Sequence, residues 1–322
     1  MSRTLASLIL LLIGALARTA QAGEIGNSTR TRAEYRGLFF SYDRLVHRSH
    51  LRAAGDLRTR LAELRRRLIP SSAMRVSLEG EVAVAVPHVE AARLVRLSRG
   101  FHVAVFSGSR RIETDVLTGF ELRSFEGEQP LLFFTTAREH GTDRFYVLAR
   151  TTTALAKVLG AGQLERASER ITARNSGELA AYFARNRGEL EVLLNACFCY
   201  PDCPCGELVA AIERRGGIEQ AFTGLITLES WKTELDGDGD LVYVVQGRGP
   251  ESWLRFVAVI LSGVPEPLVV AHADFDQILH LNGRPHLLIH RFEPGTGSRA
   301  VVLLRVGRGE LASVFLDDSY SD

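Results

Sequence analysis

The chain contains 322 residues, of which 46% are hydrophobic and 24% charged, and its 39 lysines and arginines nearly balance its 38 aspartates and glutamates. This length is sufficient for a large core in one or two domains, and a formal net charge of +1 argues against nucleic-acid binding by a generally basic protein. Only Lys157 and Lys232 are lysines, and this preference for arginine is typical of a GC-rich bacterial genome.

Residues 1–22 are predicted to be a cleavable signal peptide. Arg3 supplies a short positive start, residues 5–17 are apolar, and the run Ala20-Gln21-Ala22 has small residues where a signal peptidase reads them. Because a membrane-spanning helix needs about 20 apolar residues, cleavage is favoured over an uncleaved membrane anchor. We therefore expect a mature chain from Gly23 that is periplasmic or secreted, in a bacterium, with no membrane attachment after cleavage.

Residues 23–74 are expected to form an N-terminal segment with one helix at about 48–68. Five leucines recur there at helical spacing, and arginines occupy the other face. These leucines are Leu51, Leu57, Leu61, Leu64 and Leu68. Pro70 is expected to end the helix. The arginine face is typical of a solvated helix surface, and contact with anions is the alternative.

An alternation of apolar residues every second position predicts a first β region at 75–151 and a second β region at 221–322. Residues 152–220 between them are expected to be a helical insert, with Ser176 as the capped start of one helix. The expected helices are 152–171, 176–196 and 206–215. The predicted fold class is therefore α+β, with β-rich repeat units that a helical insert interrupts.

Four places in the β regions share an apolar residue, then Glu, Asp or Asn, then Gly, with a strand beginning three or four positions later. They are Leu78-Glu79-Gly80, Phe125-Glu126-Gly127, Leu235-Asp236-Gly237 and Leu281-Asn282-Gly283. The central residues are 47, 110 and 46 positions apart, and a period of about 40–50 residues is typical of one four-stranded propeller blade. Gly suits such tight turns because it adopts a positive φ without steric cost. The sequence therefore predicts repeated units in an irregular propeller or in packed β-meanders.

The segment from Glu234 to Tyr243 places alternate carboxylates on a glycine-rich turn. Such a turn can surround a calcium ion with hard oxygen ligands. The segment resembles the calcium loop of FG-GAP or VCBS-type repeats, which build integrin-like β-propellers. The resemblance implies Ca²⁺ as a cofactor, with Glu234, Asp236 and Asp238 as ligands, and Asp240 adds a further carboxylate. A hairpin turn without metal is the alternative.

Four cysteines lie within nine residues between two predicted helices: Cys197, Cys199, Cys203 and Cys205. In an exported protein, paired cysteines are usually disulfides. The symmetric spacing favours Cys197 with Cys205 and Cys199 with Cys203, and the pairing of Cys197 with Cys203 and Cys199 with Cys205 is the alternative. A four-thiolate site for zinc or copper(I) and redox chemistry are the other interpretations.

Six histidines and aspartates crowd into nineteen residues: His272, Asp274, Asp276, His280, His286 and His290. These residue types bind metals and transfer protons, although no H-E-x-x-H spacing is present and polar strand positions are the simpler interpretation. Motifs such as G-x-S-x-G, S-x-x-K and a phosphate-binding glycine loop are also absent from the sequence. The sequence therefore favours an exported binding protein for an unknown protein or polysaccharide, and an exported hydrolase or a soft-metal-handling protein are the alternatives.

Overall fold

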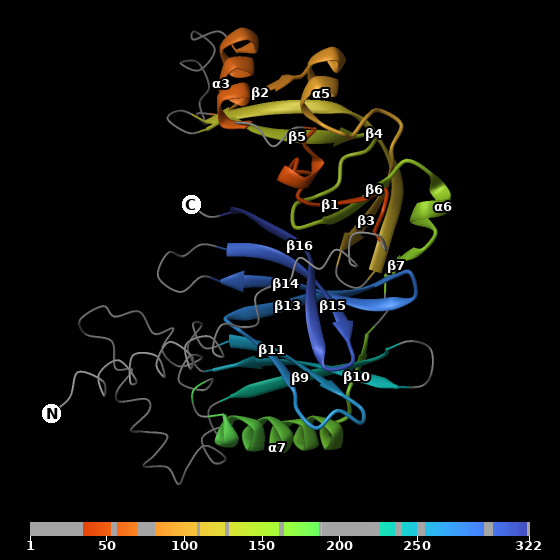
Figure 1. Ribbon diagram of the computed structural model, residues 1–322, viewed down its shortest axis with the longest axis vertical. Helices are drawn as coiled ribbons and strands as arrows, with labels where there is room; N and C mark the ends of the chain where they lie inside the picture. Colours follow the sequence, from red (N-terminus) through yellow and green to blue (C-terminus); the bar gives the residue numbers. More distant parts are fainter. Residues whose placement is uncertain are drawn as a thin grey trace, which may run out of the picture. The chain divides into compact units, whose positions relative to one another are not determined.

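Figure 1 shows the computed structural model of the chain. The structure describes residues 35–52, 57–69, 81–107, 110–125, 129–160, 164–186, 188, 226–235, 240–249, 255–292 and 299–320. The described chain is rich in antiparallel strands and has a few helices, which confirms the α+β class. Contacts divide it into an N-terminal unit, residues 32–162 with 280–282, and a C-terminal unit, residues 163–279 with 283–322.

The N-terminal unit is built on a twisted antiparallel sheet with the strand order β1-β6-β3-β4-β2, to which β5 adds by pairing with β4. The strands of this unit are β1 (Leu38–Tyr42), β2 (Glu81–Ala85), β3 (His102–Ser107), β4 (Arg110–Phe125), β5 (Leu131–Thr136), β6 (Phe145–Ala149) and β7 (Val158–Gly160). β4 has 16 residues. Its first half pairs with β3, and its second half lies between β2 and β5.

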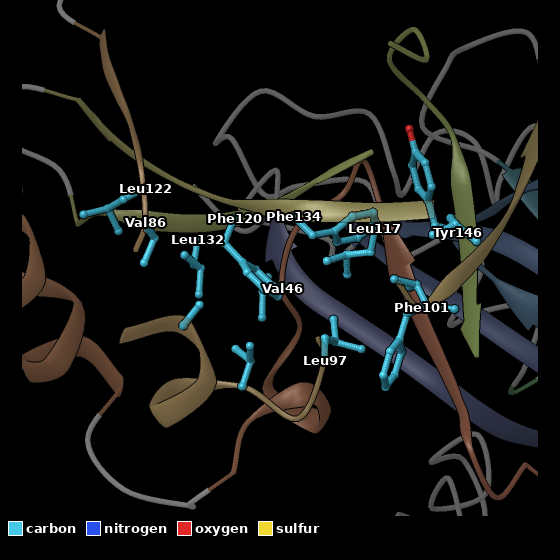
Figure 2. Close-up of a cluster of buried hydrophobic side chains, with 14 of the residues drawn as sticks. Val46, Val86, Leu97, Phe101, Leu117, Phe120, Leu122, Leu132, Phe134 and Tyr146 are labelled. Carbon is cyan, nitrogen blue, oxygen red and sulfur yellow. The ribbon is translucent and has the colours of Figure 1, made fainter. Parts of the chain in front are cut away.

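Two helices, α3 (Leu57–Leu68) and α5 (His88–Leu94), share one hydrophobic core with these strands. α3 contributes the buried Leu61 and Leu64, and β4 contributes Leu117, Phe120 and Leu122, which Figure 2 shows among their neighbours. The unit also contains a 3-10 turn, η1 (Arg48–His50), and a short helix, α6 (Thr152–Leu155). This core explains the leucine spacing, because every fourth or third residue of a helix returns to the same face.

The single helix expected at 48–68 was wrong at its start. The chain forms η1 at its first residues, and Leu51 then makes an isolated antiparallel bridge with Val95. The α-helix begins only at Leu57. Leu51 therefore packs against the core as part of a β bridge, which helical spacing alone does not distinguish from a helix position.

The C-terminal unit contains two runs of four consecutive strands. In one sheet the order is β12-β11-β10-β9-β8, and in the other β13 to β16 are neighbours in chain order. The bounds are β8 (Glu165–Arg166), β9 (Thr227–Glu234), β10 (Leu241–Arg248), β11 (Arg255–Leu261), β12 (Leu268–Ala271), β13 (Ala273–Leu281), β14 (Arg284–Phe292), β15 (Arg299–Gly307) and β16 (Glu310–Tyr320).

Two of the four repeat positions predicted from the sequence, 236 and 282, fall between the first two strands of each run. Residue 236 lies between β9 and β10, which pair antiparallel, and Asn282 lies between β13 and β14. Asn282 and Gly283 have φ values of 53° and 79°, the two positive values that a type I′ turn needs. Residues 79 and 126, like 236 itself, lie outside the described residues, so the equivalence of the four turns stays a prediction.

α7 (Glu169–Arg185) covers one face of the β9–β12 sheet, as Figure 1 shows. Its Leu179 and Phe183 pack against Tyr243, Val245 and Phe256 of β10 and β11. The helix buries one apolar stripe in this way and leaves its other face polar. No helix in the described part of the chain is both long and apolar enough to span a membrane.

Two expectations for the helical insert were wrong. Residues 152–171 do not form one helix, because α6 ends at Leu155 and the chain then forms the short strands β7 and β8. Ser176 does not start a helix, because α7 already begins at residue 169, where the Ser168 hydroxyl accepts a hydrogen bond from the Ile171 N–H at 3.4 Å. The later expected helix, at 206–215, lies outside the described residues.

Candidate functional site

A groove of about 570 Å³ lies in the C-terminal unit between the first turns of α7 and the first half of β9. Residues 226–230 form one wall, and residues 166–176 contribute the other. Both polar and apolar side chains line it. Its volume is within the range of about 300–1,000 Å³ that small-ligand sites occupy.

The wall formed by β9 is a strand edge. β8 pairs only with Trp231 and Lys232, and beyond it the Ala167 N–H donates to the Ser230 carbonyl at 2.8 Å. Backbone groups of alternate residues in a strand point the same way, so the N–H and C=O of Leu228 point to the same side as the Ser230 carbonyl, away from β10. No described strand pairs with Leu228 on that side.

Side chains give this groove two kinds of surface. Ile226 and Leu228 are half-buried against the apolar cluster beneath α7. Arg166 and Glu229 form an exposed ion pair at 2.9 Å. The buried Asn175 side chain of α7 donates to the Ser230 hydroxyl at 3.4 Å and links the helix to the strand. The groove therefore combines an apolar part, a charged pair and the backbone groups of Leu228, with which no described strand pairs.

Of the histidines and aspartates that the sequence analysis noted, the structure pairs Asp276 with His290, and Asp274, two residues before Asp276 on β13, pairs with arginines. The Arg255 guanidinium contacts Asp274 at 2.5 Å, and Arg248 lies 3.6 Å from the same carboxylate. Asp276 lies 3.5 Å from Nε2 of His290. His280 and His286 are on β13 and β14 outside this cluster, and Nδ1 of the buried His286 lies 2.9 Å from the Arg284 carbonyl.

His290 has a charged neighbour at each ring nitrogen. The Arg299 Nε–H donates to its Nδ1 at 3.1 Å, so the ring proton of the neutral form sits on Nε2, toward Asp276. The side chain is 8% exposed. This arrangement places His290 within a network of charged side chains.

The same region contains a corner at which the chain passes from one sheet to the other. His272 alone separates β12 from β13, and its φ is +54°. Its N–H donates to the Arg255 carbonyl of one sheet, and its carbonyl accepts from the Phe292 N–H of the other. A single residue therefore continues the hydrogen bonding of both sheets, and the ion pairs around Asp274 surround this corner.

The buried Gln246 connects the two sheets through its amide. Its Nε2 approaches the carbonyl oxygens of Gly247, Phe256 and Ala273 at 3.0–3.3 Å, and its Oε1 accepts from the Phe275 N–H at 2.6 Å. The residue is 1% exposed. Buried polar groups stay in the interior only when they are hydrogen-bonded, and this amide bonds to both sheets.

The expected calcium turn is described only at its ends. The Leu235 N–H donates to the Asp240 carbonyl at 2.9 Å and closes the loop, and the Asp240 carboxylate accepts from Arg308 at 2.8 Å. Glu234 ends β9. Asp236 and Asp238 lie outside the described residues, as do Cys197, Cys199, Cys203 and Cys205. Within the described part of the chain, no three His, Asp or Glu side chains gather as metal ligands do.

A buried histidine–aspartate pair in the N-terminal unit was missed by the sequence analysis. Nε2 of His140 lies 2.8 Å from the Asp115 carboxylate, which also accepts from the N–H groups of Val116 and Arg138 at 2.7 and 3.1 Å. Burial by itself raises the pKa of Asp115, but these hydrogen bonds and the histidine charge outweigh it and hold the pKa below its usual value. No spacing motif connects residues 115 and 140.

The turns beside this pair have strained backbone. Asp43, Arg44 and Asp143 have positive φ values of 48°, 66° and 57°, and the Asp43 N–H donates to the Arg144 carbonyl. Nearby, burial raises the pKa of Tyr146 to about 12, and its ring lies against that of His140. Strained residues of this kind gather at functional sites as well as at tight turns, and here they close the paired ends of β1 and β6.

Comparison with family models, with curated proteins and with solved structures finds no match for this chain. A function for the protein has to be inferred from the residues and the geometry described above.

Proposed function

We propose that this protein is an exported binding protein that takes an extended polypeptide segment into the groove between α7 and β9. The observation that carries the proposal is the strand edge inside the groove. Leu228 presents backbone N–H and C=O groups there, and β8 covers only the far end of β9. Addition of an extended peptide to an exposed sheet edge is a common mode of recognition.

The groove provides both affinity and selectivity for such a segment. Main-chain hydrogen bonds to Leu228 are independent of the ligand sequence, whereas every second ligand side chain would face the same wall. On one side that wall is apolar, with Ile226 and Leu228. The Arg166–Glu229 pair offers charges of both signs. We therefore expect ligands with apolar residues at alternate positions and a charged residue near one end.

The two runs of four strands support a finer proposal for the architecture. Each run is an antiparallel meander whose first hairpin carries one predicted repeat position. Meanders of this kind are the units of propellers, in agreement with the resemblance to FG-GAP or VCBS-type repeats. We propose that the C-terminal unit consists of two such repeats, packed as β-meanders, with loops and a sheet edge available for binding.

A proline at Leu228 tests the strand-addition proposal. Leu228→Pro removes the N–H that points into the groove, while the hydrogen bonds between β9 and β10 use other residues. Peptides selected from a random library on the wild-type mature protein are expected to bind this variant at least about fivefold more weakly, because one backbone hydrogen bond contributes about 1 kcal/mol. Isothermal titration calorimetry measures the affinities.

The matched control is Leu228→Ala, which shortens the same side chain and keeps the N–H. It separates the backbone contact from the loss of apolar surface. Circular dichroism and tryptophan fluorescence check that both variants are folded. Equal affinities of the two folded variants for the selected peptides would show that the edge of β9 does not bind them, and failure to select any peptide on the wild type would remove the proposal.

We also propose that calcium stabilises the turn between β9 and β10 through the carboxylates from Glu234 to Asp240. A ligand that binds only the native state stabilises it by about 2.7 kcal/mol at one hundred times its dissociation constant. Calcium added to chelator-treated protein is therefore expected to raise the melting temperature, and the double variant Asp236→Ala, Asp238→Ala should lose this increase. A melting temperature of the wild type that does not respond to calcium would leave a metal-free hairpin.

A further inference from the structure

The near-neutral chain consists of two units with opposite charge. Residues 32–162 contain 21 lysines and arginines against 14 aspartates and glutamates, whereas residues 163–322 contain 15 against 23. A difference of this size between parts of one chain indicates a charged partner for at least one of them. Within the N-terminal unit, the positive charge is concentrated on two neighbouring helices.

α3 and α5 together carry six arginines and two glutamates. The arginines are Arg58, Arg60, Arg65, Arg66, Arg67 and Arg93, and the glutamates are Glu63 and Glu90. We call this set the basic helical surface. Leu61, Leu64 and Leu68 of α3 lie in the core or pack against it, so the arginines lie on the flanks and the outer face of the helix.

The arginines of α3 are arranged in columns. Arg58 and Arg65 are seven residues apart, as are Arg60 and Arg67, and seven residues make about two helical turns. Each pair therefore occupies one flank of the helix, about 10 Å apart along the axis, and Arg66 lies between the two flanks. An extended anion along α3 would meet several guanidinium groups at once.

The acidic side chains nearby leave most of this charge unbalanced. Arg67 forms a bidentate pair with Glu90 of α5, at 2.8 and 3.2 Å, which lowers the pKa of Glu90 chiefly through these hydrogen bonds. The pair holds the two helices side by side. Arg58 and Arg66 are exposed and make no ion pair with another described residue. Like charges held close together repel, and an anion relieves this repulsion.

We infer that the basic helical surface binds a linear polysaccharide that carries carboxylate or sulfate groups. Guanidinium groups match such anions because their planar N–H groups form two parallel hydrogen bonds. Neither helix has a Phe, Tyr or Trp side chain on which nucleic-acid bases would stack. The apolar faces of α3 and α5 are used by the core, and Val89 is the one large hydrophobic side chain of these helices that is strongly exposed among the described residues, which is too little for insertion into a lipid bilayer.

The test uses the full mature chain and heparin as the probe, with neutral dextran as the reference. The double variant Arg58→Gln, Arg66→Gln removes two exposed charges and keeps residues that favour helix. Its matched control is Arg170→Gln, Arg185→Gln, which removes two exposed arginines from α7. We expect the first variant to bind heparin about tenfold more weakly at low salt, a loss of about 1.4 kcal/mol of binding free energy, and the control to bind like the wild type.

The dependence on salt gives a second readout. Each guanidinium that contacts the polymer displaces bound counterions, so the slope of log affinity against log salt should be shallower for the Arg58, Arg66 variant than for the control. Equal losses in both variants, or no heparin binding by the wild type, would overturn the inference. Tighter binding to vesicles rich in phosphatidylglycerol or to duplex DNA, through the same two arginines, would overturn the assignment to a polysaccharide.

Discussion

Replacement of Gln246 by glutamate is expected to lower the free energy of unfolding of the C-terminal unit by about 3–5 kcal/mol at pH 7, the cost of a buried charge without a partner. The change conserves shape but removes both amide N–H donors. The new carboxylate would face the carbonyl oxygens of Gly247, Phe256 and Ala273, which the amide now approaches. Only the Phe275 N–H would remain as a donor to it.

The effect should depend on pH in a defined direction. The folded state disfavours the charged form, so the introduced carboxyl has a folded-state pKa above the ordinary value of about 4.3. The penalty is therefore absent well below pH 4, appears as the pH rises through that value, and is complete above the folded-state pKa. Urea unfolding followed by fluorescence measures it, because both tryptophans, Trp231 and Trp253, belong to the C-terminal unit.

Gln246→Met is the matched control, since it has a similar length and introduces no charge. It should also be destabilised, by about 1–3 kcal/mol from the unpaired Phe275 N–H and its neighbours, but without the dependence on pH. If the glutamate variant were as stable as the wild type at pH 7, the amide of Gln246 would not be the connection between the two sheets.

Asp115→Asn is expected to destabilise the N-terminal unit by about 2–3 kcal/mol at pH 7. The carboxylate accepts hydrogen bonds from His140 and from the N–H groups of Val116 and Arg138, and hydrogen bonds to charged groups contribute about 1.5–3 kcal/mol. An asparagine keeps one acceptor oxygen and turns its NH₂ group toward one of these donors. The protection of amides in β4 and β6 against hydrogen exchange, measured as a function of urea, reports the stability of this unit.

The sign of the pH dependence follows from the lowered pKa of Asp115. Its folded-state pKa is below the ordinary 3.8, so its contribution to stability is present above about pH 3.8 and is lost as the pH falls through the folded-state pKa. The wild type and Asp115→Asn should therefore converge at strongly acidic pH. Glu113→Gln, on the same strand and more exposed, should cost less than about 1 kcal/mol; a larger loss there than at Asp115 would contradict this role of the buried pair.

Most of the strands could be predicted because their signal is local. In β3, β6, β10, β11, β14 and β15 most side chains are buried, and in β5 the burial alternates; apolar runs and period-two patterns report this directly. The helices were less certain. The run from 152 to 171 contains helix-forming residues, yet residues 158–160 and 165–166 form strands. Their pairing with other strands outweighs the local helix propensity.

Some residues of the candidate sites could be predicted from the sequence, and others could not. Asp276 and His290 could be suspected because they lie on β13 and β14, neighbours joined by a two-residue turn. Asp115 and His140 could not, since their contact depends on how β4 and the loop after β5 fold together. The exposed edge of β9 could not be predicted from the sequence either, because it depends on which strands pair with β9 in the folded sheet.

The strand order of the N-terminal unit has a consequence for the order in which its strands can pair during synthesis. β1 emerges early, yet its partner is β6, and Leu38 pairs with Ala149. Closing so long a loop is entropically costly, and contacts between distant residues slow folding. The meanders of the C-terminal unit need only neighbouring strands and can form hairpin by hairpin. β1 must therefore wait, with Phe39 and Phe40 still unpaired, until residue 149 has been made, and this interval is the one in which a holding chaperone would matter most.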